Sequence, residues 1–264
     1  MTLITFSTDY GVVDEFVGVC HLVIARIAPD VRVLDVVHGL RGVRGGSFVL
    51  AQSLIEAPDD AVHLVVVDPG VGTNRRAVAV ACGNGSFLVG PDNGVLFPTA
   101  DLLDGALAAY ELRETWFMRD TRSSTFHGRD IFAPAAAHLA LGVPPHEFGP
   151  ALDVDSLVRL PPPDVHVSSG TLRSEVVRVD HFGNVQLAAT GSDLAISSLA
   201  GAVSVNGMRA SVGQKFADVG PGELLVYVNS AGHVALARNG ASADEMLGSP
   251  ASVTLSAVDQ GGSG

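Results

Sequence analysis

Side chains able to do acid–base chemistry stand at three places in the sequence. The stretch TFHGRDIFAP brings His127, Arg129 and Asp130 within four positions. Asp9 and Asp68 each directly follow a strongly apolar segment. An imidazole can accept a proton near neutral pH, and a carboxylate can stabilise the charged ring. These residue types indicate proton transfer if the fold brings His127 to the carboxylates, whereas Arg129 and Asp130 are expected to be structural, as an ion pair or as helix-start charges.

The glycine-rich run DPGVGTNRR, which starts at Asp68, invites comparison with phosphate-binding loops. It lacks the GKS or GKT ending of a P-loop and opens no helix, and no GxGxxG pattern follows the first apolar segment. What remains is a tight loop that returns Arg75 or Arg76 toward Asp68. A turn or capping role for Asp68 is about equally compatible with its position.

A metal centre is not predicted. The chain has nine histidines but no HxH, HExxH or two-His-one-carboxylate spacing, and Cys20 and Cys82 do not have the spacing of a zinc site. The two cysteines are expected to be buried thiols in a reducing compartment. Any water that is activated here would have to be activated by side chains alone.

The elements that position these side chains alternate between strands and helices in the first half of the chain. The apolar patterns predict strands at 3–8, 31–37 and 61–68, helices at 14–29 and 45–57, a hairpin over 76–94, and a helix over 129–142 that either starts near Pro134 or is kinked there. Near-continuous apolar strands are typical of a parallel sheet covered on both faces. Ligands of such sheets bind beyond the carboxyl ends of the strands, so Asp9 and Asp68 are expected on one rim.

Three consecutive prolines in VRLPPPDVHV end the alternation of strands and helices, because they can continue neither a helix nor a central strand. Short β-patterned runs follow, and Asn206-Gly207 between two of them is a strong hairpin-turn signal. We expect an N-terminal α/β domain with a mainly parallel sheet at 1–158, a Pro-rich linker at 159–168, and a smaller C-terminal β-barrel domain at 169–258.

The composition argues against nucleic acids and membranes as partners of this chain. Apolar residues make up 47% of the chain, and the formal net charge of −12 argues against binding to a nucleic-acid backbone. No apolar run reaches about 18 residues, which argues against a membrane span. The N-terminus has no basic region of the kind that opens a signal peptide, so a cytoplasmic location is expected.

Six motifs in a fixed order carry a specific resemblance: TDYG, VVDPGVGTNRRAV, VGPDNGVL, TFHGRDIFAP, VDHFGNVQL and YVNSAGHVALARNG. Together they resemble the S-adenosyl-L-methionine hydroxide adenosyltransferase family, which is related to the fluorinase and chlorinase enzymes. The resemblance implies an α/β domain, a β-barrel, and a homotrimer with active sites between subunits. It also implies hydrolysis of S-adenosyl-L-methionine to adenosine and methionine by water or hydroxide that attacks the ribose 5′ carbon. S-adenosyl-L-methionine is then the substrate, and no cofactor is expected.

The resemblance also implies roles for individual residues. The water-activating set maps to Asp68, Arg75 and His127, and the sequence leaves open which of them takes the proton. Carried over as substrate-binding residues are Asp9 for the ribose hydroxyls, Asp14 and Asp180 for the methionine amino group, Phe182 and Asn184 for adenine, Ser230 and Arg238 for the methionine carboxylate and the adenine, and Asn93 and Phe126 for the same pocket.

Several positions depart from the halogenase pattern. The halogenases carry tyrosine where this chain has Asp68 and His127, and Gly128 stands where the fluorinase has a serine that holds its halide. These three residues favour the hydroxide-using branch. Ala231 stands where the fluorinase has an arginine, which leaves open how the methionine carboxylate is bound. A chlorinase and a non-catalytic sensor of adenosine or S-adenosyl-L-methionine remain as alternatives.

Overall fold

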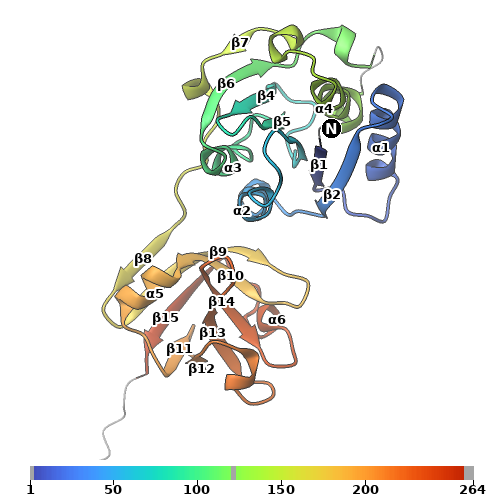
Figure 1. The fold of residues 1–264 in the computed structure, drawn as a ribbon. Coiled ribbons are helices and arrows are strands. Elements are labelled where there is room, and N and C mark those ends of the chain that lie inside the picture. Colours follow the sequence, from blue (N-terminus) through green and yellow to red (C-terminus); the bar gives the residue numbers. More distant parts are fainter. Residues whose placement is uncertain (1–2, 120–122, 259–264) are drawn as a thin grey trace, which may run out of the picture. The chain divides into compact units, whose positions relative to one another are not determined.

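The computed structural model describes residues 3–119 and 123–258, and the chain forms two compact units, Met1–Leu160 and Pro161–Gly264 (Figure 1). Each unit has its own sheet, with a buried core on each face of the first sheet and one core in the second unit.

The first unit is built on one sheet with the strand order β2-β1-β3-β5-β4-β6-β7. Its strands are β1 (Leu3–Thr8), β2 (Arg32–His38), β3 (Val62–Val66), β4 (Ala77–Cys82), β5 (Phe87–Pro91), β6 (Ala106–Glu111) and β7 (Ala151–Leu152). Strands β2, β1, β3 and β5 run parallel, whereas β4 pairs antiparallel with both β5 and β6, and β6 with β7. The short turn after β4 can give only an antiparallel hairpin, whereas a parallel pair needs a long crossover. The sheet is therefore mixed, and it is parallel over the half that carries Asp9 and Asp68.

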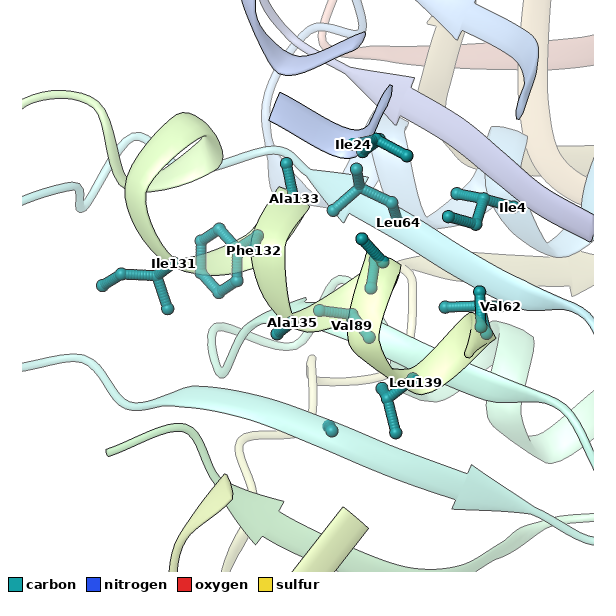
Figure 2. Packing of buried hydrophobic residues seen from close by; sticks show 14 of the residues in the cluster. Ile4, Ile24, Val62, Leu64, Val89, Ile131, Phe132, Ala133, Ala135 and Leu139 are labelled. Atoms are coloured by element: carbon teal, nitrogen blue, oxygen red, sulfur yellow. The ribbon is translucent and has the colours of Figure 1, made fainter. Parts of the chain in front are cut away.

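Helices cover both faces of this sheet. Helices α1 (Phe16–Ile27) and α4 (Ala133–Ala140) pack on one face, and α2 (Val43–Leu54) and α3 (Phe97–Leu102) pack on the other (Figure 1). The alternation of strand side chains divides β3 between the two cores, with Leu64 and Val66 in one and Val65 in the other. Figure 2 shows the first core, in which side chains of the strands meet those of the segment that enters α4.

A π-helical turn, Gly128–Phe132, leads into α4. Pro134 lies in the first turn of α4, where its missing N–H leaves no helical hydrogen bond unmade, so the predicted helix start is confirmed. Short 3₁₀ turns complete the chain at Thr115–Phe117, Pro145–Phe148, Val154–Ser156 and Phe216–Asp218.

The second unit is a β-barrel. Its strands are β8 (Val165–Ser168), β9 (Thr171–Val179), β10 (Val185–Thr190), β11 (Ala202–Val205), β12 (Met208–Val212), β13 (Leu224–Val228), β14 (His233–Arg238) and β15 (Ser252–Ala257), with helices α5 (Gly191–Ser197) and α6 (Ala243–Leu247). The barrel closes because β9 pairs with both β15 and β10. Asn206 and Gly207 both have positive φ in the turn between β11 and β12, so the predicted hairpin is confirmed. The expected class, an α/β domain followed by a β-barrel, is confirmed as well.

The proline run joins the two units. Strand β8 already belongs to the second unit and starts at Val165, inside the range expected to be a linker. The domain limits of 158 and 169 stay an interpretation of the sequence.

Candidate active site

Asp9 and Asp68 lie side by side at the carboxyl ends of the neighbouring parallel strands β1 and β3. The backbone N–H of Asp68 donates to Asp9 Oδ2 at 2.9 Å, and the N–H of Asp9 donates to the carbonyl of Val66 at 3.1 Å. The prediction that both carboxylates share one rim of the sheet is confirmed. Burial raises the pKa of Asp9 against the lowering effect of the hydrogen bond from Asp68, and the nearby Asp68 charge raises it further.

Arg75, and not Arg76, is the partner of Asp68. The Nε of Arg75 donates to both carboxylate oxygens of Asp68 at 3.0 Å, and Nη2 makes a further short contact with Oδ2. The two side chains are only 9% and 4% exposed. Arg76 turns to Asp92, with its Nε 2.8 Å from Oδ2. The glycine-rich loop therefore returns an arginine to Asp68, as the sequence predicted, and that arginine is Arg75.

This loop also meets the segment that precedes His127. Gly72 has a φ of +79°, and a Cβ at this position would overlap the carbonyl oxygen of Ser124. Only glycine satisfies both the backbone conformation and the close approach. The loop that carries Arg75 is thereby held against the segment that carries His127.

His127 completes the arrangement on the other side of Arg75. Its Nδ1 lies 2.7 Å from Arg75 Nη2, at the start of the π-helical turn. A guanidinium only donates hydrogen bonds, so Nδ1 must be the acceptor and the neutral ring carries its hydrogen on Nε2. Asp68 and Arg75 from one loop and His127, which is distant in the sequence, thus form one hydrogen-bonded line with the arginine in the centre.

Arg129 and Asp130 have the structural role that the sequence predicted. Asp130 is fully buried and accepts from Arg129 Nε at 2.6 Å and from the backbone N–H of Ser123 at 2.7 Å. Burial alone would raise the pKa of Asp130, but these hydrogen bonds outweigh it and hold the pKa below its usual value. The pair fixes the turn that carries His127.

The other candidate residues of the first unit lie in three different settings. Asn93 donates to the carbonyl of Val67 at 2.9 Å and accepts from the N–H of Val95, so its side chain braces the backbone next to Asp68. Asp14 is exposed in the loop before α1. Phe126 is half-buried, packs against Phe16, and lies under the guanidinium of Arg129 at 4.9 Å. Their roles in substrate binding stay predictions.

In the second unit, Asp180 organises the loop between β9 and β10. Its Oδ1 accepts from the backbone N–H groups of Phe182 and Asn184, both at 2.9 Å, and its Oδ2 accepts from Asn184 Nδ2 at 2.8 Å. The loop presents the Phe182 ring to solvent, with 76% of the residue exposed. Asp180 therefore positions the two residues beside it, and a contact with substrate remains a prediction.

A pocket of about 490 Å³ opens next to this loop. It is lined by Phe182, Asn184, Phe216, Arg238, Asn239, Gly240, Ala241 and Ser242. Three residues predicted to bind substrate thus share one pocket, whereas Ser230 lies exposed in the turn between β13 and β14. Sequence reasoning missed Phe216, whose only signal is an aromatic residue inside an otherwise polar turn.

Within 3–119 and 123–258, no group of three or more His, Cys, Asp and Glu side chains is arranged to hold a metal ion. In the same part of the chain, no helix has the length and apolar character needed to cross a membrane.

Fold and site together define a class: an α/β unit with an acidic rim, a partly buried Asp–Arg–His line at that rim, and a β-barrel with an aromatic-lined pocket. Two family profiles match this chain, the S-adenosyl-L-methionine hydroxide adenosyltransferase N-terminal domain at residues 4–149 and the C-terminal domain of the same family at 174–253. The chain belongs to the S-adenosyl-L-methionine hydroxide adenosyltransferase family.

Relatives from several bacteria resemble the chain over most of its length. A protein of Salinispora tropica named (R)-S-adenosyl-L-methionine hydrolase is 52% identical over 93% of both chains. A fluorinase of Actinopolyspora mzabensis is 30% identical over 91% of both. The solved structure of an uncharacterised conserved protein from Thermotoga maritima, at 35% identity, covers 96% of this chain and 99% of its own, with a TM-score of 0.85.

Proposed function

We propose that this protein hydrolyses S-adenosyl-L-methionine to adenosine and L-methionine, with water or hydroxide attacking the ribose 5′ carbon. The observation that carries the proposal is the line of Asp68, Arg75 and His127 at the sheet rim, beside Asp9. The name of the relative from Salinispora tropica supports the same reaction.

The chemistry requires a strong oxygen nucleophile and a good leaving group. The substrate is a sulfonium, and methionine leaves it as a neutral thioether. Bulk water has a pKa of about 15.7, so almost no hydroxide is present near neutral pH without help. The positive charge of Arg75 stabilises hydroxide or the partial negative charge of an attacking water. Holding the oxygen and carbon in line contributes up to roughly 7–11 kcal/mol.

The geometry also suggests where the proton goes. His127 uses Nδ1 to accept from Arg75, so in this arrangement the ring holds Arg75 in place and is not the base. We assign the proton to Asp68, because an ionised carboxylate has about four lone-pair sites and retains acceptor capacity beside Arg75. Water becomes strongly acidic as its oxygen bonds to carbon, so a carboxylate is a sufficient base.

No metal takes part in this proposal. The carboxylate of Asp68, the best-placed oxygen ligand, is already bound by the guanidinium of Arg75 on both oxygens. A cation there would have to share these oxygens with the guanidinium, whose positive charge repels it. Turnover should therefore persist in a chelator, and activity that chelation abolishes and a metal restores would overturn this part.

Substrate binding is proposed to use residues of both units. On this assignment Asp9 binds the ribose hydroxyls, Phe182, Asn184 and Arg238 hold adenine in the barrel pocket, and Asp14, Asp180 and Ser230 bind the methionine end, with Asn93 and Phe126 shaping the pocket. The homotrimer that the family resemblance implies, in which subunits share each active site, is part of this proposal.

Subunit mixing tests the shared site. Arg75→Ala and Asn184→Ala each inactivate one half of the proposed site. If subunits share sites, the two inactive proteins should regain activity when they are unfolded and refolded together. Mass measurement in solution should give three chains per particle, and a monomer would refute this part of the proposal.

The deciding experiment for the reaction is a product assay. Purified protein is incubated with S-adenosyl-L-methionine, with and without chloride, and adenosine, methionine and 5′-chloro-5′-deoxyadenosine are separated by chromatography. Both configurations at sulfur are offered, because the relative's name specifies (R). Adenosine with equimolar methionine supports the proposal, a chlorinated main product would favour a chlorinase, and tight binding without turnover would favour a sensor.

A cytoplasmic location is also part of the proposal. Cys20 and Cys82 are free and buried, which suits a reducing compartment. Fractionation of a producing cell tests it.

A further inference from the structure

Tyr10 was not among the residues that the sequence singled out, yet it touches both neighbours of His127. It directly follows Asp9 at the end of β1. Its ring packs edge-on against Phe126, with centroids 5.8 Å apart and planes at 79°. Phe16 at the start of α1 packs against the same two rings, at 5.7 Å from Tyr10 and 5.3 Å from Phe126. Phe126, the residue before His127, is therefore held in place by aromatic contacts with Tyr10 and Phe16.

The hydroxyl of Tyr10 reaches the residue after His127. A Cβ on Gly128 would overlap the hydroxyl oxygen and lie 3.1 Å from Cζ and 3.3 Å from Cε2 of the ring. Gly128 does not have a positive φ, so close approach, and not backbone conformation, accounts for glycine here. Burial raises the pKa of Tyr10 far above its usual value, with smaller contributions from Cys20, Asp9 and Asp68, so the side chain stays a neutral phenol.

These contacts make Tyr10 a link between two parts of the site. Its backbone continues from Asp9, which binds the N–H of Asp68, and its side chain holds the turn that carries His127. The 2.7 Å contact between His127 Nδ1 and Arg75 depends on the placement of that turn.

We propose that Tyr10 is a positioning residue of the active site, which sets His127 against Arg75 through its contacts with Phe126 and Gly128, and that Gly128 and Tyr10 form a size-matched pair. The role in turnover rests on the hydrolase function proposed above, whereas the contact itself does not.

A double-mutant cycle tests the pair. Gly128→Ala should lower kcat about a hundredfold, because the new methyl group displaces either the turn or the phenol. Tyr10→Phe keeps the ring and removes the hydroxyl that contacts Gly128, and should lower kcat about threefold to tenfold with KM within twofold. In Tyr10→Phe/Gly128→Ala the severe overlap is gone and the remaining 3.1 Å contact needs only a small shift. The double variant should therefore be at least fivefold more active than Gly128→Ala.

The controls separate positioning from general damage and from failure of the proposed function. Tyr110→Phe removes a phenol from β6 and should leave kcat unchanged. Nitrogen-15 NMR of the His127 imidazole, assigned by its absence in His127→Gln, should show hydrogen on Nε2 in the native protein and a shifted or mixed tautomer signal in Tyr10→Phe. Effects that multiply across the cycle, or an unchanged His127 signal in Tyr10→Phe, would overturn the proposal. If the native protein does not turn over substrate, the hydrolase function fails, and the NMR comparison alone decides the positioning role.

Discussion

The placement of Arg75 between Asp68 and His127 leads to a sharp prediction about His127. In the structure this ring offers Nδ1 to Arg75 as an acceptor. Asparagine places its amide oxygen near the position of Nδ1 but cannot titrate. His127→Asn therefore keeps the acceptor and removes any base, whereas His127→Ala removes both.

The expected magnitude follows from the contact that is lost. A hydrogen bond to a charged group contributes about 1.5–3 kcal/mol. Since about 1.4 kcal/mol corresponds to a factor of ten in rate, His127→Ala should lower kcat roughly tenfold to 150-fold. His127→Asn should stay within about tenfold of the native enzyme, and clearly above His127→Ala.

The assay is adenosine release measured over a range of substrate concentrations, so that kcat and KM are obtained separately. His166→Asn, an exposed position on β8, serves as the matched control and should behave like the native protein. If His127 is instead the base, both substitutions should cost about the same, at least about a hundredfold. Equal losses in Asn and Ala would refute the assignment of the proton to Asp68.

Three further outcomes are expected. Asp9→Ala should raise KM more than it lowers kcat, because the ribose is bound in ground and transition states alike. Asp9→Asn keeps an acceptor for the N–H of Asp68 and therefore controls for disturbance of the backbone. Equal damage to KM and kcat in Asp9→Ala would show that ribose placement sets the attack geometry. Combining Asp68→Tyr with His127→Tyr should lower hydrolysis at least about a hundredfold, and adenosine release at the native rate would contradict the roles of both residues. Burial lowers the pKa of His63 to about 4, below the usual 6.5, so the folded protein binds fewer protons than the unfolded chain between these values. Stability should therefore fall by about 3 kcal/mol as the pH drops from 6.5 to 4; His63→Leu should flatten this part of the urea-unfolding profile, and an identical slope in both proteins would contradict the shift.

Much of the fold was predictable because it depends on short-range patterns. The apolar runs before Asp9 and Asp68 predicted buried strands, and the crossover helices between them made the first strands parallel. Asn206-Gly207 predicted its hairpin because the turn requires positive φ at both residues. The antiparallel half of the sheet was harder to predict from the sequence, since nothing in the residues of β6 indicates that this strand pairs with β4.

The candidate site was predictable as a set of residues, but not as an arrangement. Asp68, Arg75 and His127 came from the motifs, and their hydrogen-bonded line came from the structure. Phe216 was missed because its neighbours in the pocket lie on other loops of the barrel. The family resemblance predicted Asp180 and Asn93 as substrate contacts, and the structure adds that the side chains of both make hydrogen bonds within the loops around them.

By itself the sequence determined which chemical groups are present, which segments form strands and helices, and that a glycine-rich loop returns an arginine toward Asp68. Tertiary structure alone decided that Arg75 is that arginine, that Nδ1 of His127 is an acceptor, and that Tyr10 fills the space over Gly128. Local patterns report on the periodicity of a segment, whereas hydrogen-bond direction and steric fit depend on atoms that distant segments bring together. The identity of a residue can be read from the chain, but the proton that it carries and the space that it fills depend on its neighbours in the fold.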